Sequence, residues 1–343
     1  MPDETNASMP QVLTRRDFTT GRTVRWCPGC GDYSILSQIQ KTFPELGRKK
    51  EDFVFVSGIG CSSRFPYYMD TYGFHTIHGR ATSIATGLKM ANPDLSVWIA
   101  TGDGDCLSIG GNHFIHLLRR NLDINLLLFN NRIYGLTKGQ YSPTSEFGKV
   151  TKSTPQGSID WPFNPPALAL GAAATFIARS IDVESKHLQE MIKAAYKHHG
   201  TSFLEIYQKC IIFNNDAFLT LTEKGTKADR QLLLEDGKPM LFGKDLTQGI
   251  YMDCACPEVI DLTDGKYSID DVLVHDKTDR MKALILSEMT YRPEFPVPLG
   301  IIYEVEKNTY EDLTYQQIDQ AVEKVGPGDM DAILRAGHTW EIK

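Results

Sequence analysis

Two groups of residues in this sequence have the types and spacing needed for chemistry. The first is Gly102-Asp-Gly-Asp105, followed one helix and one strand later by Asn130-Asn131. Asp103 offers a carboxylate oxygen and Asn131 an amide oxygen, which are ligands that Mg²⁺ prefers, and the backbone carbonyl of Ile133 is placed to complete the set. The glycines let the backbone approach a phosphate closely. Either motif alone is also typical of a strand-to-helix turn, but their joint occurrence favours a site for Mg²⁺ and a diphosphate.

The second group consists of cysteines. Cys27-Pro-Gly-Cys30 places two thiols on one tight turn, which fits a zinc site, a redox dithiol or half of an iron–sulfur site. Three further cysteines each follow a predicted strand: Cys61, Cys106 and Cys210. Spacing alone does not choose two of these three. Cys254 and Cys256 follow no such strand, and we expect them to be less suited as ligands.

Several basic residues lie close to these groups. Arg64 follows Cys61 by three positions, and its guanidinium suits bidentate binding of a carboxylate on the substrate, although an acidic surface or a partner subunit would also satisfy it. Lys138 is placed to meet a diphosphate or a substrate carboxylate. His78 and Gly79 precede a predicted helix that begins at Arg80 and whose N-terminus would favour an anionic cofactor, although Arg80 would equally serve a subunit interface.

The elements that must position these residues alternate along the chain. Short apolar runs predict strands at 53–57, 95–101, 124–129, 174–178 and 203–207. Amphipathic patterns predict helices at 80–91, 112–120, 166–170 and 185–198. Such alternation indicates an α/β protein with an open, mostly parallel sheet and helices on both faces. Because ligands of these sheets bind outside the carboxyl ends of the strands, we expect both groups of residues to meet there.

The 343 residues divide into three parts by pattern. We expect residues 1–22 to form an arm with little structure, residues 23–215 to form the α/β domain, and residues 216–343 to form an irregular extension that packs on this domain or on a partner. Only a strand at 300–305 and a helix at 314–325 can be identified in the extension.

Composition excludes several classes of protein. The net charge of −7 argues against a general nucleic-acid or anionic-membrane surface. The sequence contains no apolar run long enough for a membrane span and no signal-peptide pattern, so we expect a cytoplasmic protein. Seven cysteines, an odd number, do not indicate a disulfide framework.

Five motifs together resemble a known family. They are Trp26-Cys-Pro-Gly-Cys-Gly31, Gly58-Ile-Gly-Cys-Ser-Ser-Arg-Phe-Pro66, His78-Gly-Arg-Ala81, Gly102-Asp-Gly-Asp105 and Asn130-Asn-Arg-Ile-Tyr-Gly-Leu-Thr-Lys-Gly-Gln140. In this order the five motifs look like the beta subunit of the 2-oxoacid:ferredoxin oxidoreductases. The Gly102–Asp105 motif together with Asn130-Asn131 also resembles the thiamine diphosphate motif. The resemblance covers residues 20–215 and implies a thiamine diphosphate-binding fold.

The resemblance also implies cofactors and the residues that hold them. It implies thiamine diphosphate, Mg²⁺ held by Asp103, Asn131 and Ile133, and one [4Fe–4S] cluster. The cluster ligands would be Cys27, Cys30, Cys61 and Cys210, with Cys106 left as an ordinary thiol; a structural zinc ion on the same four is the alternative. The cofactor-binding residues that we expect are Ile59, Gly60, Cys61, Ser62, His78, Gly79, Arg80, Gly102, Asp103, Gly104, Asp105, Asn131, Ile133, Tyr134, Gly135, Leu136 and Thr137.

The function implied is one half of an oxidoreductase. It would interconvert 2-oxoglutarate plus coenzyme A with succinyl-CoA plus carbon dioxide and pass electrons to ferredoxin. Arg64, Leu136 and Lys138 would line the substrate pocket, and a cation there favours a dicarboxylic acid. The carboxylate that activates the cofactor would come from an alpha subunit, in a dimer of alpha–beta pairs. The alternatives are a subunit acting on pyruvate or on a broad range of 2-oxoacids, and a zinc-stabilised α/β binding module without catalysis.

Overall fold

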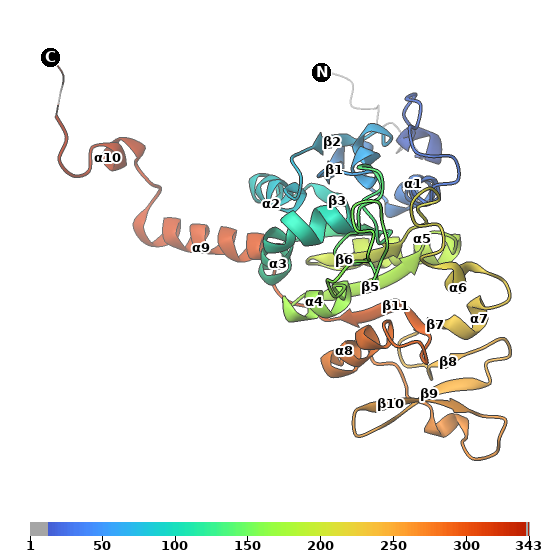
Figure 1. Cartoon of the computed structure of the whole chain (residues 1–343). Coiled ribbons are helices and arrows are strands. Elements are labelled where there is room, and N and C mark those ends of the chain that lie inside the picture. Colours follow the sequence, from blue (N-terminus) through green and yellow to red (C-terminus); the bar gives the residue numbers. More distant parts are fainter. Residues whose placement is uncertain (1–12, 341, 343) are drawn as a thin grey trace, which may run out of the picture.

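A computed structural model describes residues 13–340 and 342, and its centre is an eight-stranded sheet (Figure 1). The strand order is β2-β1-β3-β4-β6-β5-β11-β7. All neighbouring strands are parallel except β11 and β5. The strands are β1 (Phe53–Ser57), β2 (Tyr72–His75), β3 (Ser96–Gly102), β4 (Ile124–Asn130), β5 (Phe176–Ile181), β6 (Ser202–Tyr207), β7 (Gln231–Leu233) and β11 (Val297–Glu304). The predicted open, mostly parallel α/β fold is confirmed.

Helices cover both faces of this sheet. Successive side chains of a strand point to opposite faces, so Val54 and Val56 of β1 join one core while Phe53 and Phe55 join the other. The first core is closed by α2 (Ala81–Ala91), α3 (Gly111–Arg120), α4 (Pro165–Gly171) and α8 (Arg280–Met289). The second is closed by α1 (Asp32–Thr42) and α5 (Ser185–Lys197). Burial on both faces explains why the strands are apolar throughout.

The carboxyl ends of five neighbouring strands meet at one edge of the sheet. Because β1, β3, β4, β5 and β6 are mutually parallel, the segments that follow them emerge on the same side. β1 leads into the 3₁₀ helix η4 (Ser62–Tyr67), and β3 leads into the π-helix η5 (Asp105–Ile109). A long loop follows β4 and returns over this edge before α4. Most of the residues singled out from the sequence lie in the segments after these strands, whereas Cys27 and Cys30 precede α1, and residues 78–80 lie between β2 and α2.

Two elements of the main domain escaped prediction. The helix α1 buries the polar side chains of Gln38 and Gln40, which interrupt the apolar pattern expected of a packed helix. The edge strand β2 exposes all four of its residues and therefore carries no apolar signal.

The N-terminal part differs from the expected unstructured arm. Residues 1–12 lie outside the described residues, but Arg15–Phe18 forms a 3₁₀ helix, η1. Phe18 is fully buried and its ring packs edge-on against Phe43 and Phe53. A single aromatic residue among polar neighbours has no periodicity, so the sequence does not reveal this anchor.

Part of the extension belongs to the main sheet, and part of it lies outside that sheet. Its strands β7 and β11 pair with each other, and β11 pairs with β5, so residues 297–304 belong to the main sheet. A separate three-stranded sheet contains β8 (Leu241–Phe242), β9 (Gln248–Asp253) and β10 (Cys256–Asp261). The short helices α6 (Leu219–Thr222) and α7 (Lys227–Arg230) precede it, and α9 (Tyr310–Val325) and α10 (Met330–Leu334) project from the body (Figure 1). In the described part of the chain, no helix combines the length and apolarity needed to cross a membrane.

Candidate cofactor and cluster site

Three adjoining cavities lie at the carboxyl edge of the sheet. The first, which we call the aspartate cavity, has a volume of about 110 Å³ and is bounded by the segments that follow β1, β3 and β4. Its wall contains nearly all of the predicted cofactor-binding residues: Ile59, Gly60, Cys61, Ser62, His78, Gly102, Asp103, Gly104, Asp105, Asn131, Ile133, Tyr134, Gly135, Leu136 and Thr137. Gly79 and Arg80 lie beside the wall, and the Arg80 guanidinium donates to the backbone carbonyls of Gly79 and Ile109.

Asp103 is a buried carboxylate held only by neutral donors. The hydroxyls of Ser142 and Thr144 donate to its Oδ2 atom at 2.5 and 2.7 Å. Burial raises the pKa of Asp103 above its usual value, and these hydrogen bonds only partly oppose that rise. Among the described residues, no lysine or arginine forms an ion pair with it. A divalent cation on the other carboxylate oxygen would supply the missing positive charge.

Asn131 is fixed at the opposite side of the cavity by several hydrogen bonds. Its Oδ1 accepts from the backbone N–H of Ile133 at 3.1 Å, and its Nδ2 donates to Gln208 Oε1 at 2.9 Å. The Asn214 amide donates to its backbone carbonyl at 3.0 Å. Arg132, the next residue, adopts the left-handed conformation (φ 56°), which non-glycine residues rarely do. The strained backbone at Arg132 therefore lies directly beside the asparagine whose side chain it orients.

Asp105 joins the loop that follows β1 to the loop that precedes α2. Its Oδ1 accepts from the backbone N–H groups of Ile59 and Gly79 at 3.0 and 2.7 Å and from His78 Nδ1 at 2.5 Å. Its Oδ2 accepts from the Thr101 hydroxyl at 2.7 Å. All four donors come from other segments of the edge. Asp105 thus acts through the backbone it holds, and it fixes the His78 ring with Nδ1–H toward the carboxylate.

The Gly104 position admits no side chain. A Cβ atom there would lie 2.1 Å from Cε1 of Tyr134, whose hydroxyl donates to the Gly104 carbonyl at 3.0 Å. The ring of Tyr134 therefore lies directly against the backbone after β3. This contact joins the turn of the first motif to the loop of the second.

A second cavity, the cysteine cavity, has a volume of about 230 Å³. Four cysteines line it: Cys27, Cys30, Cys61 and Cys210. A Cβ atom at Gly135 would lie 3.5 Å from Cys210 Sγ and 3.7 Å from Cys61 Sγ, so glycine leaves space beside both sulfurs. The structure therefore brings together the four cysteines that the resemblance implied. All seven cysteines are free thiols.

The other three cysteines lie elsewhere. Cys106 is buried in η5 and does not line the cysteine cavity. Cys254 and Cys256 are exposed at the turn between β9 and β10, far from β1 (Figure 1).

The electrostatics of the cysteine cavity favour neutral thiols until a metal displaces the protons. Burial raises the pKa of Cys61 to about 12, and the pKa values of Cys30 and Cys210 are raised for the same reason. The negative charge of Asp32 adds to each of these rises. In the described part of the chain, no three histidine, cysteine or acidic side chains lie close enough together to hold a single metal ion.

Sequence reasoning missed four polar residues of this edge. Ser142 and Thr144 lie in the long loop after β4, where no pattern marks them. Gln208 directly follows β6, and the rule that ligands gather at carboxyl strand ends points to it. Asp32 follows the Cys27–Cys30 turn; it is buried, both its oxygens lack hydrogen-bond partners, and burial raises its pKa to about 7.

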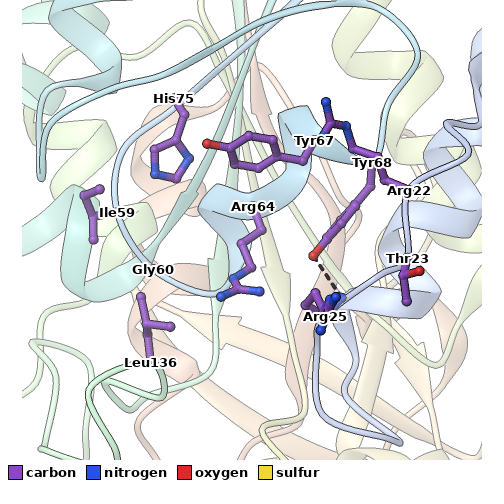
Figure 2. Close-up of a pocket in the computed structure, with 10 residues that line it drawn as sticks. All are labelled: Arg22, Thr23, Arg25, Ile59, Gly60, Arg64, Tyr67, Tyr68, His75 and Leu136. Atoms are coloured by element: carbon purple, nitrogen blue, oxygen red, sulfur yellow. Dashed lines mark hydrogen bonds between the residues drawn. The ribbon is translucent and has the colours of Figure 1, made fainter.

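The third cavity, the arginine cavity, is the largest at about 570 Å³ (Figure 2). Its wall contains Arg22, Thr23, Arg25, Ile59, Gly60, Arg64, Tyr67, Tyr68, His75 and Leu136, among which there is no acidic residue. Figure 2 shows Arg64 and Arg25 turned toward the same space, with the Arg25 backbone N–H donating to the Tyr68 hydroxyl at 2.9 Å. Such a wall favours an anionic ligand.

The three cavities adjoin through shared residues. Leu136 lines all three, Ile59 and Gly60 line the arginine and aspartate cavities, and Arg64 lines the arginine and cysteine cavities. Lys138 lines only the cysteine cavity, in the left-handed conformation (φ 78°). Arg64 and Leu136 thus stand where an anionic ligand would meet the residues of the other two cavities.

Comparison with known proteins identifies the family of the chain. Residues 58–206 match the family model described as "Thiamine pyrophosphate enzyme, C-terminal TPP binding domain". The chain is 49% identical to 2-oxoglutarate oxidoreductase subunit KorB of Mycobacterium tuberculosis over 98% of this chain and 91% of the relative. It is 48% identical to the beta subunit of 2-oxoacid:ferredoxin oxidoreductase 1 of Aeropyrum pernix over 55% of this chain and 60% of the relative.

A solved structure extends the likeness to the whole fold. It is a 2-oxoglutarate:ferredoxin oxidoreductase from Magnetococcus marinus, with 2-oxoglutarate, coenzyme A and succinyl-CoA bound. The identity is 32% and the TM-score 0.76, over 98% of this chain and 99% of the other. On the identity and coverage of these relatives, the chain belongs to the family of beta subunits of 2-oxoacid:ferredoxin oxidoreductases.

Proposed function

We propose that this chain is the cofactor-bearing half of a 2-oxoglutarate:ferredoxin oxidoreductase. The reaction converts 2-oxoglutarate and coenzyme A to succinyl-CoA and carbon dioxide, and its two electrons reduce ferredoxin one at a time. The observation that carries the proposal is the meeting of the three cavities: a buried carboxylate–amide pair, four gathered cysteines, and a cationic wall that contains Arg64.

The aspartate cavity suits the diphosphate end of thiamine diphosphate. Asp103, Asn131 and the Ile133 carbonyl would hold Mg²⁺, which would bind the diphosphate. Thiamine diphosphate, when bound, supplies a carbanion that attacks the keto carbon and an electron sink after carbon dioxide leaves. Residues of this chain would orient the cofactor. Asp105 holds the two loops that carry Ile59 and Gly79, and the Tyr134 ring packs against the backbone at Gly104.

The cysteine cavity favours a [4Fe–4S] cluster over zinc. A zinc ion needs its ligands within about 2.3 Å of one point. The four cysteines line a cavity of about 230 Å³, which offers more space than one ion fills. Gly135 keeps that space free beside Cys61 and Cys210. The cluster would accept single electrons from the cofactor and pass them to ferredoxin.

Arg64 supports a dicarboxylic substrate. The described residues include no acidic side chain that forms an ion pair with it, so its guanidinium is available to a ligand. We propose that it binds the distal carboxylate of 2-oxoglutarate while Leu136 packs against the carbon chain. Lys138, on the wall of the cysteine cavity, would contribute positive charge to the same region.

A partner subunit completes the proposed site. Among the described residues, no glutamate lines the aspartate cavity, so we propose that the carboxylate that activates the aminopyrimidine ring comes from the alpha subunit. The extension at 216–343 is the proposed contact. Its projecting helix α9 exposes large apolar side chains that a partner would cover: Ile318, Val322 and Val325. Without the partner, the chain should be inactive.

The experiment that tests the substrate assignment compares two arginines of one cavity. In the anaerobic complex with the alpha subunit, Arg64→Ala should raise KM for 2-oxoglutarate about 10- to 100-fold, the loss expected for hydrogen bonds between charged groups. It should leave kcat/KM for pyruvate unchanged. Arg22→Ala, on the far wall, serves as the control for a general loss of positive charge. An equal loss on both acids in the Arg64 variant would contradict the assignment and favour a broad 2-oxoacid range.

A further inference from the structure

The side chain of Gln208 connects the proposed magnesium ligand to a proposed cluster ligand. Its Oε1 accepts from Asn131 Nδ2 at 2.9 Å. Its Nε2 donates to Cys30 Sγ at 3.2 Å and to the Lys209 carbonyl at 2.7 Å. The side chain is 1% exposed, and every donor and acceptor of its amide group has a partner.

The orientation of this amide follows from its neighbours. If its oxygen and nitrogen were exchanged, the oxygen would face the Lys209 carbonyl, and two acceptors would meet. Asn131 is fixed in the same way, because its Oδ1 must face the backbone N–H of Ile133. The direction of both hydrogen bonds is therefore determined: Asn131 donates to Gln208, and Gln208 donates to the sulfur of Cys30.

We propose that Gln208 is a positioning residue that raises the reduction potential of the cluster and couples that potential to occupancy of the magnesium–diphosphate site. The inference rests on the proposed function. An N–H donated to a coordinating sulfur stabilises the more negative, reduced cluster. When Asn131 Oδ1 binds Mg²⁺, its Nδ2–H becomes a stronger donor, which polarises the Gln208 amide and strengthens its bond to the sulfur. A loaded cofactor site therefore prepares the cluster to accept an electron.

The test is a redox titration of the cluster in the anaerobic alpha–beta complex, followed by electron paramagnetic resonance. Gln208→Met keeps the length of the side chain and removes the amide. Gln208→Leu is the second variant if the first binds less iron. The control is Gln189→Met in α5, which removes an amide hydrogen bond to Gln38 in α1, away from the cavities.

Two results are expected. With Mg²⁺ and thiamine diphosphate bound, the Gln208 variants should titrate at a lower potential than the wild type, and Gln189→Met should titrate with the wild type. Removing Mg²⁺ and the cofactor should lower the potential of the wild type by more than that of the Gln208 variants. A Gln208 variant whose cluster has the same potential as the wild type would overturn the inference. So would a Gln208 variant whose potential decreases as much as that of the wild type when Mg²⁺ and the cofactor are removed. The iron, sulfide and cofactor contents of the wild-type complex are measured first. A wild-type complex without a cluster would contradict the proposed function, whereas the titration results above bear on the role of Gln208 alone.

Discussion

The buried ion pair between Arg179 and Glu205 connects the stability of the sheet to the site. Arg179 Nε donates to Glu205 Oε2 at 2.7 Å, and both side chains are fully buried between β5 and β6. The other oxygen of Glu205 accepts from the Asn130 Nδ2 at 2.8 Å. Asn130 precedes the proposed magnesium ligand, so this pair also fixes the end of β4.

Arg179→Met leaves the Glu205 carboxylate buried without a cation. Removing one partner of a buried pair costs about 3–5 kcal/mol. With an unfolding entropy of roughly 2.1 cal/mol/K per residue, a chain of this length should melt roughly 4–7 °C lower. Lys50→Met provides the control, because the Lys50–Asp70 pair is partly exposed and its loss should cost less than about 1 kcal/mol.

Thermal unfolding of the purified chain measures the loss of stability in Arg179→Met. The double variant Arg179→Met/Glu205→Met completes the experiment. Replacing both charges by apolar side chains should restore most of the lost stability, because no uncompensated charge remains. The affinity of the double variant for Mg²⁺ and thiamine diphosphate, measured by calorimetry, should be lower than that of the wild type, because Asn130 has lost Glu205 as its acceptor.

Two outcomes would refute this reasoning. One is a melting temperature of Arg179→Met within a degree or so of that of Lys50→Met. The other is a double variant that binds the cofactor as tightly as the wild type, which would show that the Glu205–Asn130 hydrogen bond does not position the site.

Two further predictions follow from single residues. Gly135→Val should lower the iron content of the complex, because the valine methyl groups would occupy the space beside Cys61 and Cys210. Gly171→Val, at an open helix end, is the control and should not lower it. Equal iron contents in the two variants would contradict the cluster assignment. His275 donates through Nε2 to the Ile301 carbonyl, and burial lowers its pKa, so the unfolded chain binds the proton more readily. The free energy of unfolding should therefore reach its full value above about pH 6.5 and decrease at lower pH. Urea titrations at about pH 5 and pH 7.5 measure this decrease, which should be smaller in His275→Gln than in the wild type. An equal decrease in both proteins would exclude His275 as its source.

Much of the site could be predicted because its residues follow strands. Asp103 and Asn131 come directly after strands, Cys61 and Cys210 follow strands by a few residues, and the parallel sheet brings such positions to one edge. Local sequence therefore determines where these residues lie. The fold class follows for the same reason, since strands buried on both faces are apolar throughout.

What could not be predicted depends on contacts between distant segments. Ser142 and Thr144 reach Asp103 only because the long loop folds back over the edge. Arg179 and Glu205 lie inside strands, where a charged residue predicts exposure, and only their pairing makes burial tolerable. Phe18 and β7 likewise depend on partners far along the chain.

The metal content of the anaerobically purified alpha–beta complex tests the central claim most directly. We expect about four iron atoms and four acid-labile sulfides per chain and no stoichiometric zinc. Cys210→Ala should lose the cluster, whereas Cys106→Ala, outside the cysteine cavity, should keep it. Stoichiometric zinc without sulfide, or an intact cluster in Cys210→Ala, would contradict the account.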